Sequence, residues 1–565
     1  MRLNGYKANK TKSPPRVFFV AAFSSLLAAL SQPSFFFQNG CALLAWIALT
    51  PLFIGIKAQK HSIRLALGLE FGLVYLIVSQ YWLFSYHPAA LFFAAFLFGL
   101  RFAILILLIG IALDRLGSFG PLSAAGLWAL SEYLATRGFL GYEFGALAAS
   151  QYRVPFLVHT ASLYGIFGLS FFICLVNADF ARLFEKAIDR TKKDLEPGLS
   201  RLSRLSAFTL GDAKLKIKLR REDFLPLLGG GLALAILIVA ADLNPRSDKT
   251  IKIALIQPDI RVEQRGIDDY RQAIIRLRAL TQEALEKKPD LIVWHETAIV
   301  PSINWHRTIR DNSALWSLLE NIDSYMADLG VPIVFGNSLA ELQTGPVSAG
   351  RIDRNAAILK FGRMENAYTK SKLVPFAETF PLGEKFPSLG AFVERITGPA
   401  WSAGKGPILL QLPPVDERPA IPFGTPICFE DGFGDYCAAF AKSGAGFLVV
   451  ITNDAWARSL AAQNQHAALS AFRSSESGLA LARAASTGTT AAFLPDGNIL
   501  GELPAFTQGV LIVDIPWKAS ADAASTLYLS YGDYPVMLIG FASLFAVLIA
   551  WFFRRNGSRK TNPSH

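Results

Sequence analysis

The stretch FFAAFLFGLRFAILILLIGIAL, residues 92–113, decides the fold class of the first half of the chain. Arg101 is its only charged residue, and every other position is apolar or glycine. A helix needs about 20 apolar residues to cross the roughly 30 Å hydrocarbon core of a bilayer. The stretch is long enough, and it therefore predicts a transmembrane helix.

Apolar runs of the same kind recur along the first half of the chain and once near its end. They predict eight transmembrane helices, over residues 17–32, 41–57, 65–86, 90–113, 120–136, 157–178, 224–242 and 534–553. The first run follows a basic segment, as a secretion signal would, but another apolar run comes directly after it, so it is interpreted as a membrane anchor. The composition agrees with a membrane protein, because 18% of the residues are charged, where about 25% is usual in soluble domains.

The basic residues indicate how the chain would sit in the membrane. The formal net charge is +11, and Lys and Arg concentrate in the segments 1–16, 57–64, 182–221 and 554–560. An eight-span count puts these four segments on one side, which the positive-inside rule makes cytoplasmic. Because the sequence shows no recognition motif and no interleaved aromatic residues, the charge does not indicate a nucleic-acid partner. Residues 244–530 are then expected on the opposite side of the membrane.

The sequence divides into three predicted parts: a membrane domain with seven helices (1–243), an extracytoplasmic domain (244–530), and a last transmembrane helix with a basic cytoplasmic tail (531–565). In the extracytoplasmic part, short apolar runs typical of strands alternate with helical patterns. The predicted strands are 252–258, 290–296, 331–337, 356–361, 447–454, 489–495 and 509–515. The predicted helices are 269–287, 313–330 and 467–486. Such alternation indicates an α/β fold with helices layered on buried sheets.

The chain has four cysteines, and their spacing fits neither a CxxC pair nor a metal site. Cys41 and Cys174 lie in apolar runs, where a thiol behaves as a small hydrophobic group. Cys428 lies in the stretch TPICFED, residues 425–431, and Cys437 follows shortly after it. A disulfide between this last pair and a nucleophilic role for Cys428 are both open at this point.

Three short motifs of the extracytoplasmic part contain residues suited to acyl transfer. The stretch LIVWHE ends at Glu296, YTKSK contains Lys370 and Lys372, and TPIC ends at Cys428. Taken singly, each residue has a structural explanation as a helix cap, a solvated charge or a packed thiol. Together they form a set, because a thiol needs a base, a carboxylate can be that base, and an ammonium group can stabilise the thiolate and the oxyanion of acyl transfer.

The order Glu296, Lys370, Cys428, in the stretches VWHE, YTKSKLVPFAE and ICFE, resembles the carbon–nitrogen hydrolase (nitrilase) superfamily. This resemblance implies an αββα sandwich. The longer stretch KLVPFAETFPL, the later ITNDAW and QH, and the predicted membrane spans around the domain are similar to the apolipoprotein N-acyltransferase family, a membrane-embedded branch of that superfamily.

By position, the resemblance implies that Glu296 is the general base, that Lys370 stabilises the oxyanion and that Cys428 is the nucleophile. Lys372 occupies a position that the family often fills with histidine. The residues implied to support the site are Glu378, Phe429, whose backbone N–H would complete an oxyanion hole, and Glu430. The reaction would use no metal and no organic cofactor.

The family resemblance implies a two-step transfer between lipid substrates. Cys428 would take an acyl chain from a membrane phospholipid as a thioester, and the α-amino group of a diacylglyceryl-modified N-terminal cysteine on an apolipoprotein would then receive it as an amide. Both substrates stay in the bilayer, because each buried methylene is worth about 0.8 kcal/mol. The expected location is the inner membrane of a bacterium, crossed several times, with the catalytic domain of a monomer on the periplasmic side.

Several alternatives are open on sequence alone. A membrane-anchored amidase or nitrilase would use the same three residues with water as the acceptor. A transporter with an outer binding domain would need paired discontinuous helices or inverted repeats, which the sequence does not show. The aromatic loop 378–396 is suited either to dipping into the membrane interface or to packing on its own domain. Within the spans, Arg101 and Glu132 would either line a polar path or reach the interface.

Overall fold

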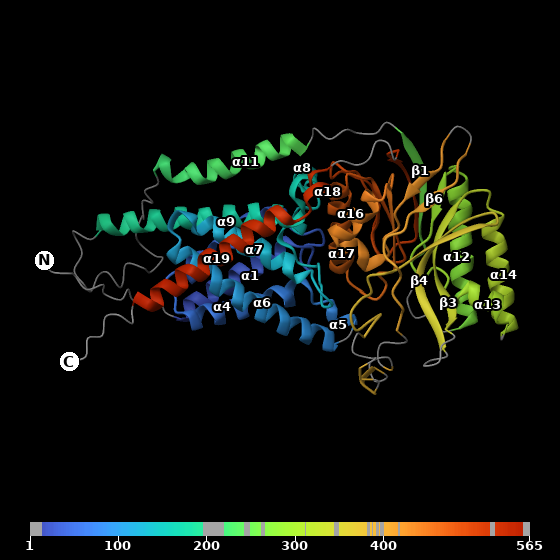
Figure 1. Ribbon diagram of the computed structural model, residues 1–565, viewed down its shortest axis with the longest axis horizontal. Coiled ribbons are helices and arrows are strands. Elements are labelled where there is room, and N and C mark those ends of the chain that lie inside the picture. Colours follow the sequence, from blue (N-terminus) through green and yellow to red (C-terminus); the bar gives the residue numbers. More distant parts are fainter. Residues whose placement is uncertain are drawn as a thin grey trace.

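The computed structural model describes residues 14–557 except 87, 196–219, 242–248, 261–265, 311, 344–349, 381–384, 387, 391–394, 396–399, 416–417 and 520–525. The first thirteen residues, most of the basic segment 182–221, the tail after residue 557 and parts of the loop 378–396 therefore lie outside the described residues. The described chain forms a long bundle of helices joined at one end to an α/β domain (Figure 1). The first and last described helices, α1 and α19, begin and end at the far end of this bundle.

The bundle consists of apolar helices that run along the long axis of the molecule (Figure 1). They are α1 Pro14–Ser31, α2 Ala42–Ala48, α3 Thr50–Ile56, α4 His61–Ser79, α5 Leu83–Tyr86, α6 Pro88–Arg115, α7 Gly120–Ala135, α8 Pro155–His159, α9 Ala161–Leu195, α11 Leu225–Ala241 and α19 Tyr534–Gly557. Large apolar side chains remain exposed on the outside of the bundle, among them Phe92, Phe96 and Leu538 at 71%, 66% and 70%. An apolar surface of this extent is typical of helices that face lipid, which supports insertion into a membrane.

Five helices of the described chain are long and apolar enough to cross a membrane. They are His61–Ser79, Pro88–Arg115, Ala161–Arg190, Arg221–Ala241 and Tyr534–Phe553. The predicted span 41–57 consists of two short helices that meet at Leu49, and the predicted span 120–136 is α7, of 16 residues. A helical membrane half with several apolar helices is thus confirmed, whereas the count of eight spans stays a prediction.

The two charged residues inside predicted spans have partners within the bundle. Arg101 of α6 donates a hydrogen bond to the Ser131 hydroxyl at 2.9 Å. Glu132 is 3% exposed and accepts hydrogen bonds from the Trp128 indole at 2.7 Å and from the backbone N–H of Leu147 at 2.8 Å. These contacts hold α6, α7 and the short helix η2, Leu147–Gln151, against one another.

The α/β domain contains two main sheets. The first has the strand order β12-β1-β2-β3-β4-β5, with β12 Gly509–Pro516, β1 Thr250–Gln257, β2 Leu291–Val293, β3 Ile333–Gln343, β4 Gly350–Phe361 and β5 Met364–Thr369. The second has the order β11-β10-β9-β8, with β11 Ile499–Leu503, β10 Thr490–Phe493, β9 Leu481–Ala485 and β8 Leu448–Thr452. A small ribbon pairs β6 Leu410–Leu412 with β7 Ile421–Phe423. The pairs β1–β2, β2–β3 and β8–β9 are parallel, and the other strand pairs are antiparallel.

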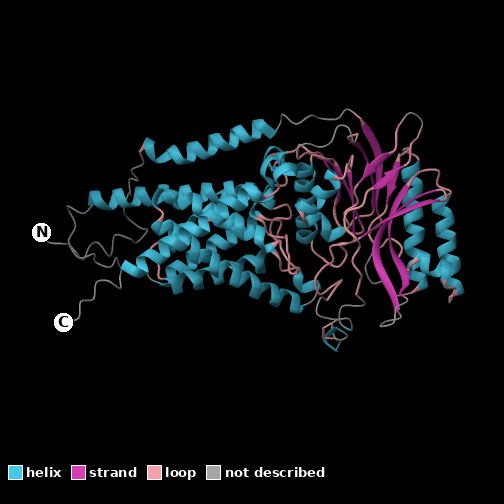
Figure 2. Ribbon diagram, viewed as in Figure 1, coloured by secondary structure: helices cyan, strands magenta, loops and turns pink. Residues whose placement is uncertain are grey.

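The strands of the first sheet pack on both faces, as their alternating residues show. In β1, Ala254 and Ile256 belong to a core shared with the outer helices, whereas Ile253 and Leu255 belong to the core shared with the second sheet. Side chains of a strand point alternately to the two faces, so this division places helices on one side and a sheet on the other. Helices cover both outer faces (Figure 2). They are α12 Ile267–Leu285, α13 Ile303–Thr308 and α14 Ser313–Ala327 on the first sheet, and α16 Gly434–Lys442 and α17 Leu460–Ser477 on the second. The predicted αββα sandwich is present.

The prediction of a single helix over 467–486 was wrong. Helix α17 ends at Ser477 because Gly478 adopts a left-handed conformation, with φ +64°, which stops a helix. Leu481–Ala485 then forms β9, fully buried and parallel to β8. Small apolar residues fit a strand covered on both faces, and they also fit a helical pattern, so the pattern alone does not separate the two. Strands β5, β6, β7 and β11 were not predicted.

The bundle and the α/β domain are joined by polar contacts at their junction. The Tyr81 and Ser459 hydroxyls lie 2.9 Å apart, and the Trp82 indole donates a hydrogen bond to Gln465. Arg153 pairs with Glu502 at 2.9 Å. The second sheet's helices α16 and α17 therefore face the bundle, as Figure 1 shows.

Candidate active site

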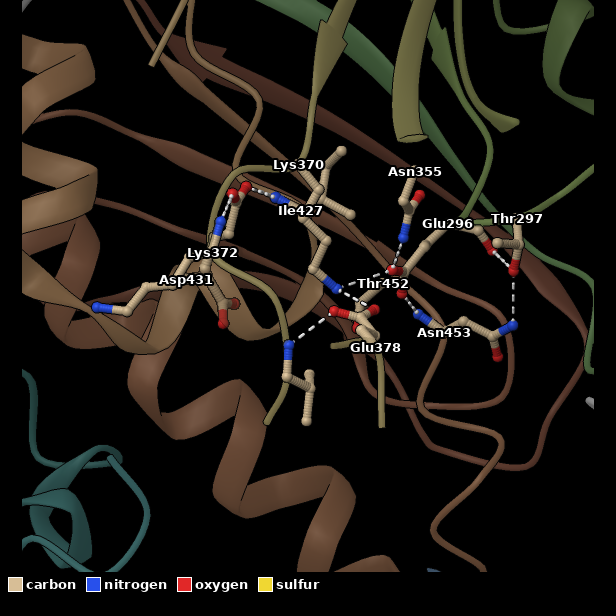
Figure 3. Close-up of polar contacts among 12 residues, drawn as sticks. Glu296, Thr297, Asn355, Lys370, Lys372, Glu378, Ile427, Asp431, Thr452 and Asn453 are labelled. Atoms are coloured by element: carbon tan, nitrogen blue, oxygen red, sulfur yellow. Dashed lines mark hydrogen bonds and ion pairs between the residues drawn. The ribbon is translucent and has the colours of Figure 1, made fainter. Parts of the chain in front are cut away.

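Glu296 lies shortly beyond the end of β2, with 5% of its surface exposed. Its Oε1 accepts hydrogen bonds from Asn355 Nδ2 at 2.6 Å and from Lys370 Nζ at 3.2 Å. Its Oε2 accepts a hydrogen bond from the backbone N–H of Asn453 at 2.9 Å. These donors come from β4 and from the ends of β5 and β8, so the carboxylate is held where the two sheets meet (Figure 3).

Lys370 follows β5 and is 1% exposed. Its ammonium group lies between Glu296 and Glu378, 3.2 Å and 2.7 Å from their nearest oxygens (Figure 3). The other Glu378 oxygen accepts a hydrogen bond from the backbone N–H of Val374. Burial lowers the pKa of Lys370, but the two carboxylates outweigh this effect and hold the pKa well above its usual value. Lys370 is therefore a fixed cation in the interior of the domain.

Cys428 begins the short helix η4, Cys428–Gly432, and is 7% exposed. Its φ is +50°, a conformation that a residue with a side chain adopts only when the surrounding structure imposes it, and that is common at active sites. Burial raises the pKa of the thiol well above its usual value, and the Glu296 carboxylate raises it further, while the Lys370 ammonium opposes them. The resting thiol thus keeps its proton and requires a base before it can act as a nucleophile.

The structure shows whether Cys428 and Cys437 form a disulfide, which the sequence left open. All four are free thiols. Cys437 lies in α16, where its sulfur is 3.9 Å from the backbone oxygen of Glu430. The alternative of a disulfide between Cys428 and Cys437 is therefore wrong for this structure.

Glu430 is completely buried and joins two of the segments that carry the site. Its carboxylate accepts hydrogen bonds from the Tyr368 hydroxyl and from the backbone N–H groups of Ser371 and Lys372, the two residues that follow Lys370 in the chain. It also accepts one from the backbone N–H of Ile427, next to Cys428. This carboxylate fixes the distance between the lysine segment and the cysteine turn.

A second group of charged side chains also lies close to Cys428. His466 donates hydrogen bonds to Asp431 at 2.9 Å and to Asp454 at 2.8 Å, and Arg483 bridges the same two aspartates at 3.1 Å and 2.5 Å. Burial lowers the pKa of His466, but the two aspartates raise it to about 9 against the opposing charge of Arg483. The ring is an imidazolium at neutral pH. One ligand atom each of Cys428, Asp454 and His466 lies within 4.8 Å of the others, but both ring nitrogens are engaged by carboxylates, so this trio is part of an ion-pair network.

Two predicted residues lie beside this core. Phe429 is 8% exposed and packs its ring on Phe433, with the centroids 5.0 Å apart. Lys372 rests its ammonium over the Phe433 ring, 3.2 Å from the centroid, and is half-buried. Neither side chain lies among the hydrogen bonds that join Glu296 and Lys370, although Lys372 follows closely in sequence.

Several residues that hold the site together were not predicted from the sequence. They are Asn355, Asn453, Asp431, Asp454, His466 and Arg483. The stretches ITND and QH were noticed, but no role was assigned to them. A polar residue inside an apolar strand is a usable signal, because burying it without a partner is unfavourable, and Arg483 in the strand LARAA fits that description.

Two family models match successive parts of the chain. Residues 24–178 match the family model described as apolipoprotein N-acyltransferase N-terminal domain, and residues 252–524 match carbon-nitrogen hydrolase. The chain is 34% identical over 551 residues to apolipoprotein N-acyltransferase 1 of Treponema pallidum, covering 94% of this chain and 95% of the relative. The chain belongs to the apolipoprotein N-acyltransferase family.

Further matches are of the same kind. Apolipoprotein N-acyltransferase 1 of Treponema denticola is 29% identical over 540 residues, covering 91% of this chain and 92% of the relative. Among solved structures, an amidase from Nesterenkonia sp. matches 48% of this chain and 93% of its own, at 20% identity and a TM-score of 0.33. The predicted family, the nitrilase-like domain and the acyltransferase class of enzyme are thereby confirmed.

Proposed function

We propose that the protein transfers an acyl chain from a membrane phospholipid to the α-amino group of the N-terminal diacylglyceryl-cysteine of an apolipoprotein. The observation that carries the proposal is a buried thiol, carboxylate and ammonium group placed together beside a bundle of apolar helices, in a chain of this family. Cys428 is the covalent carrier of the acyl chain, Glu296 is the base, and Lys370 stabilises the oxyanion.

In the first half-reaction, Cys428 attacks the ester carbonyl of the phospholipid. Glu296 takes the thiol proton, and the carbonyl oxygen becomes an oxyanion beside the Lys370 ammonium and the backbone N–H of Phe429. When the tetrahedral intermediate collapses, the carbon–oxygen ester bond breaks. Glu296 returns the proton to the leaving oxygen, and a lysophospholipid departs while the acyl group remains as a thioester.

In the second half-reaction, the free amine of the acceptor attacks the thioester carbonyl. The same ammonium group and N–H stabilise the second oxyanion, a carbon–nitrogen bond forms, and the carbon–sulfur bond breaks. A proton from the attacking nitrogen passes to Glu296 and restores the thiol, which closes a ping-pong cycle. The two lipids use one site in turn, and none of these steps requires a metal or an organic cofactor.

The proposal includes an orientation of the protein in a bacterial inner membrane. Both chain ends lie in the cytoplasm, and the catalytic domain lies on the periplasmic side. Contacts at one end of the bundle, Lys57 with Glu185 and Arg64 with Asp114, gather basic residues away from the α/β domain. The proposed parts are the membrane domain 1–243, the catalytic domain 244–530 and the C-terminal helix and tail 531–565, acting as a monomer.

The segment that carries Glu378 touches the bundle. The ring of Phe376 packs on Phe93 of α6 at 5.8 Å and on Phe139, after α7, at 5.6 Å. All three rings are partly exposed, at 37%, 44% and 39%. An apolar aromatic contact between the catalytic segment and the membrane half supports entry of acyl chains from that side.

The proposal is tested with purified protein in phospholipid vesicles that contain a labelled acyl donor. We expect a labelled thioester on the wild-type protein, followed by transfer of the label to a diacylated lipopeptide as an amide. The Cys428→Ala variant should form neither, with a loss of about 10⁵-fold or more. Release of free fatty acid without any transfer, or of ammonia from an amide substrate, would instead indicate a hydrolase.

A further inference from the structure

Glu143 is a buried carboxyl group to which the proposed mechanism gives no role. It lies in the loop between α7 and η2 and is 4% exposed. Neither of its oxygens has a hydrogen-bond partner on another described residue. Buried polar groups are nearly always paired, so an unpaired carboxyl group requires an explanation. Glu132 of the same half of the chain is equally buried but accepts two hydrogen bonds, which makes it a structural residue.

The side chain of Glu143 lies against the turn that carries the nucleophile. A methyl group added to Gly432, at the end of η4, would overlap the Cγ and the carboxyl group of Glu143. The charged groups that face this carboxyl are Lys372 from the segment after β5, His466 from α17 and Asp431 from η4. The Tyr142 hydroxyl is a further titratable neighbour from its own loop. Glu143 is therefore a residue of the membrane half that reaches the catalytic half at η4.

Electrostatics distinguish Glu143 from the other carboxyl groups around η4. Burial raises its pKa to about 8, although His466 and Lys372 lower it and Asp431 raises it. By contrast, the pKa values of Asp431 and Asp454 are lowered by their pairing with His466 and Arg483, in spite of their burial. Glu143 can thus gain and lose a proton near neutral pH, whereas the paired aspartates stay ionised.

The second half-reaction needs a group with these properties. An α-amino group has a pKa of about 7.7–8.0, so at neutral pH it is mostly an ammonium ion that cannot attack a thioester. It must be bound as a cation and must lose one proton first. The acceptor is anchored by its acyl chains, so its amino group comes from the membrane side. Of the charged neighbours of Glu143, only Lys372 is half-buried rather than buried. We therefore expect the cationic amino group of the acceptor to reach Glu143 from the Lys372 side.

We propose that Glu143 is the catalytic residue that receives the α-ammonium group of the acceptor and removes its first proton. The inference rests on the proposed function and adds to it the residue that prepares the acceptor. The carboxylate accepts one N–H proton, which gives a carboxylic acid and a free amine. The nitrogen lone pair then forms the carbon–nitrogen bond, the carbon–sulfur bond breaks, and the second proton passes through Glu296 to the Cys428 sulfur. Glu143 afterwards releases the first proton to water, which restores its carboxylate.

The test separates the two half-reactions. Wild-type protein, Glu143→Gln and the control Glu502→Gln, which alters the ion pair with Arg153 at the same junction, are first loaded with a labelled acyl chain from phospholipid. The thioester is then challenged at pH 7 with a diacylated lipopeptide or with hydroxylamine, a nucleophile that is uncharged at this pH. We expect Glu143→Gln to form the thioester and react with hydroxylamine at rates within about twofold of wild type, and to transfer to the lipopeptide about 10²-fold more slowly. Glu502→Gln should match wild type in all three rates.

The pH dependence gives an independent readout. At pH 9.5 the acceptor is already a free amine, so the defect of Glu143→Gln in lipopeptide transfer should shrink to a few-fold. Normal transfer by Glu143→Gln at pH 7 would overturn the role of Glu143 while leaving the proposed function intact. Equal losses with both nucleophiles at both pH values would overturn it as well, because they would indicate damage to the η4 turn. Failure of the wild-type protein to form a thioester would overturn the proposed function, and the role of Glu143 with it.

Discussion

Two buried charge clusters lie close to Cys428, and they differ in their balance of positive and negative charge. The reactive cluster has one cation between two carboxylates, and its members are Glu296, Lys370 and Glu378. The supporting cluster has two cations and two carboxylates, and its members are Asp431, Asp454, His466 and Arg483. An excess of negative charge attracts a proton, and a balanced set does not. The difference indicates that proton transfer belongs to the first cluster and rigidity to the second.

The strongest test of this comparison is Glu296→Gln. The variant keeps the shape of the side chain but removes the excess charge and the base, so thioester formation should fall by about 10³-fold or more. The rate of acyl loading from a labelled phospholipid measures this loss. The matched control is Glu378→Gln, which removes the same excess charge but keeps Glu296 as the base and its contact with Lys370, and it should lose only about 10–100-fold, the value of one hydrogen bond to a charged group.

Both variants should remain folded, because the glutamine oxygen can still accept the hydrogen bond from Asn355 at position 296 or from the backbone N–H of Val374 at position 378. If Glu296→Gln loads acyl chains at the wild-type rate, the excess negative charge has no part in the chemistry and the comparison fails.

The supporting cluster is tested by Arg483→Met, which keeps the volume but leaves two buried aspartates with one imidazolium. Removing one partner of a buried ion pair costs about 3–5 kcal/mol, so the midpoint of thermal unfolding in detergent should fall sharply. Protein that remains folded at low temperature should still load acyl chains at a rate close to wild type. If Arg483→Met keeps the thermal stability of the wild type but forms no acyl thioester, Arg483 takes part in the chemistry and does not belong to the supporting cluster.

The two clusters also differ in how far the sequence could predict them. Glu296, Lys370 and Cys428 each lie at the end of an extended segment, and the chemistry of a thiol, a base and a cation singles them out as a set. The supporting cluster could not be assembled in this way, because Asp431, His466 and Arg483 are far apart in the chain and meet only after folding. Arg483 was placed in a helix, although it is in β9.

The same physical reason limits the fold prediction. Short apolar runs identified β1, β3 and β4, which are covered by helices on one face and by a sheet on the other. They did not identify β9, because its small residues LARAA follow α17 closely and continue a pattern that also fits a helix. Glu143 lies in a loop, where periodicity carries no information, and only the contact with Gly432 reveals it.

A third test uses the pKa of His466, which is raised from 6.5 to about 9. A group whose pKa is higher in the folded protein stabilises the fold fully below its unfolded value, and this contribution is lost as the pH rises through the folded value. The wild-type protein should therefore lose thermal stability between about pH 6.5 and pH 9, and His466→Gln, which cannot ionise, should lack this part of the decline. Parallel declines for the two proteins would mean that His466 is neutral in the folded state.

The smallest expected effect concerns Glu143, which belongs to neither cluster but touches the turn between them. Gly432→Ala should destabilise the protein by about 1–3 kcal/mol, because its methyl group overlaps the Glu143 side chain. In the background of Glu143→Ala the space is free, so the same substitution should cost less than about 0.5 kcal/mol, and the two changes should be strongly non-additive in thermal unfolding at pH 7. Gly434→Ala is the matched control, since its methyl group meets Glu476 and Tyr528 instead and should cost the same in both backgrounds. An equal cost of Gly432→Ala in the two backgrounds would show that η4 itself excludes the methyl group, and would remove the contact that links the membrane half to the nucleophile turn.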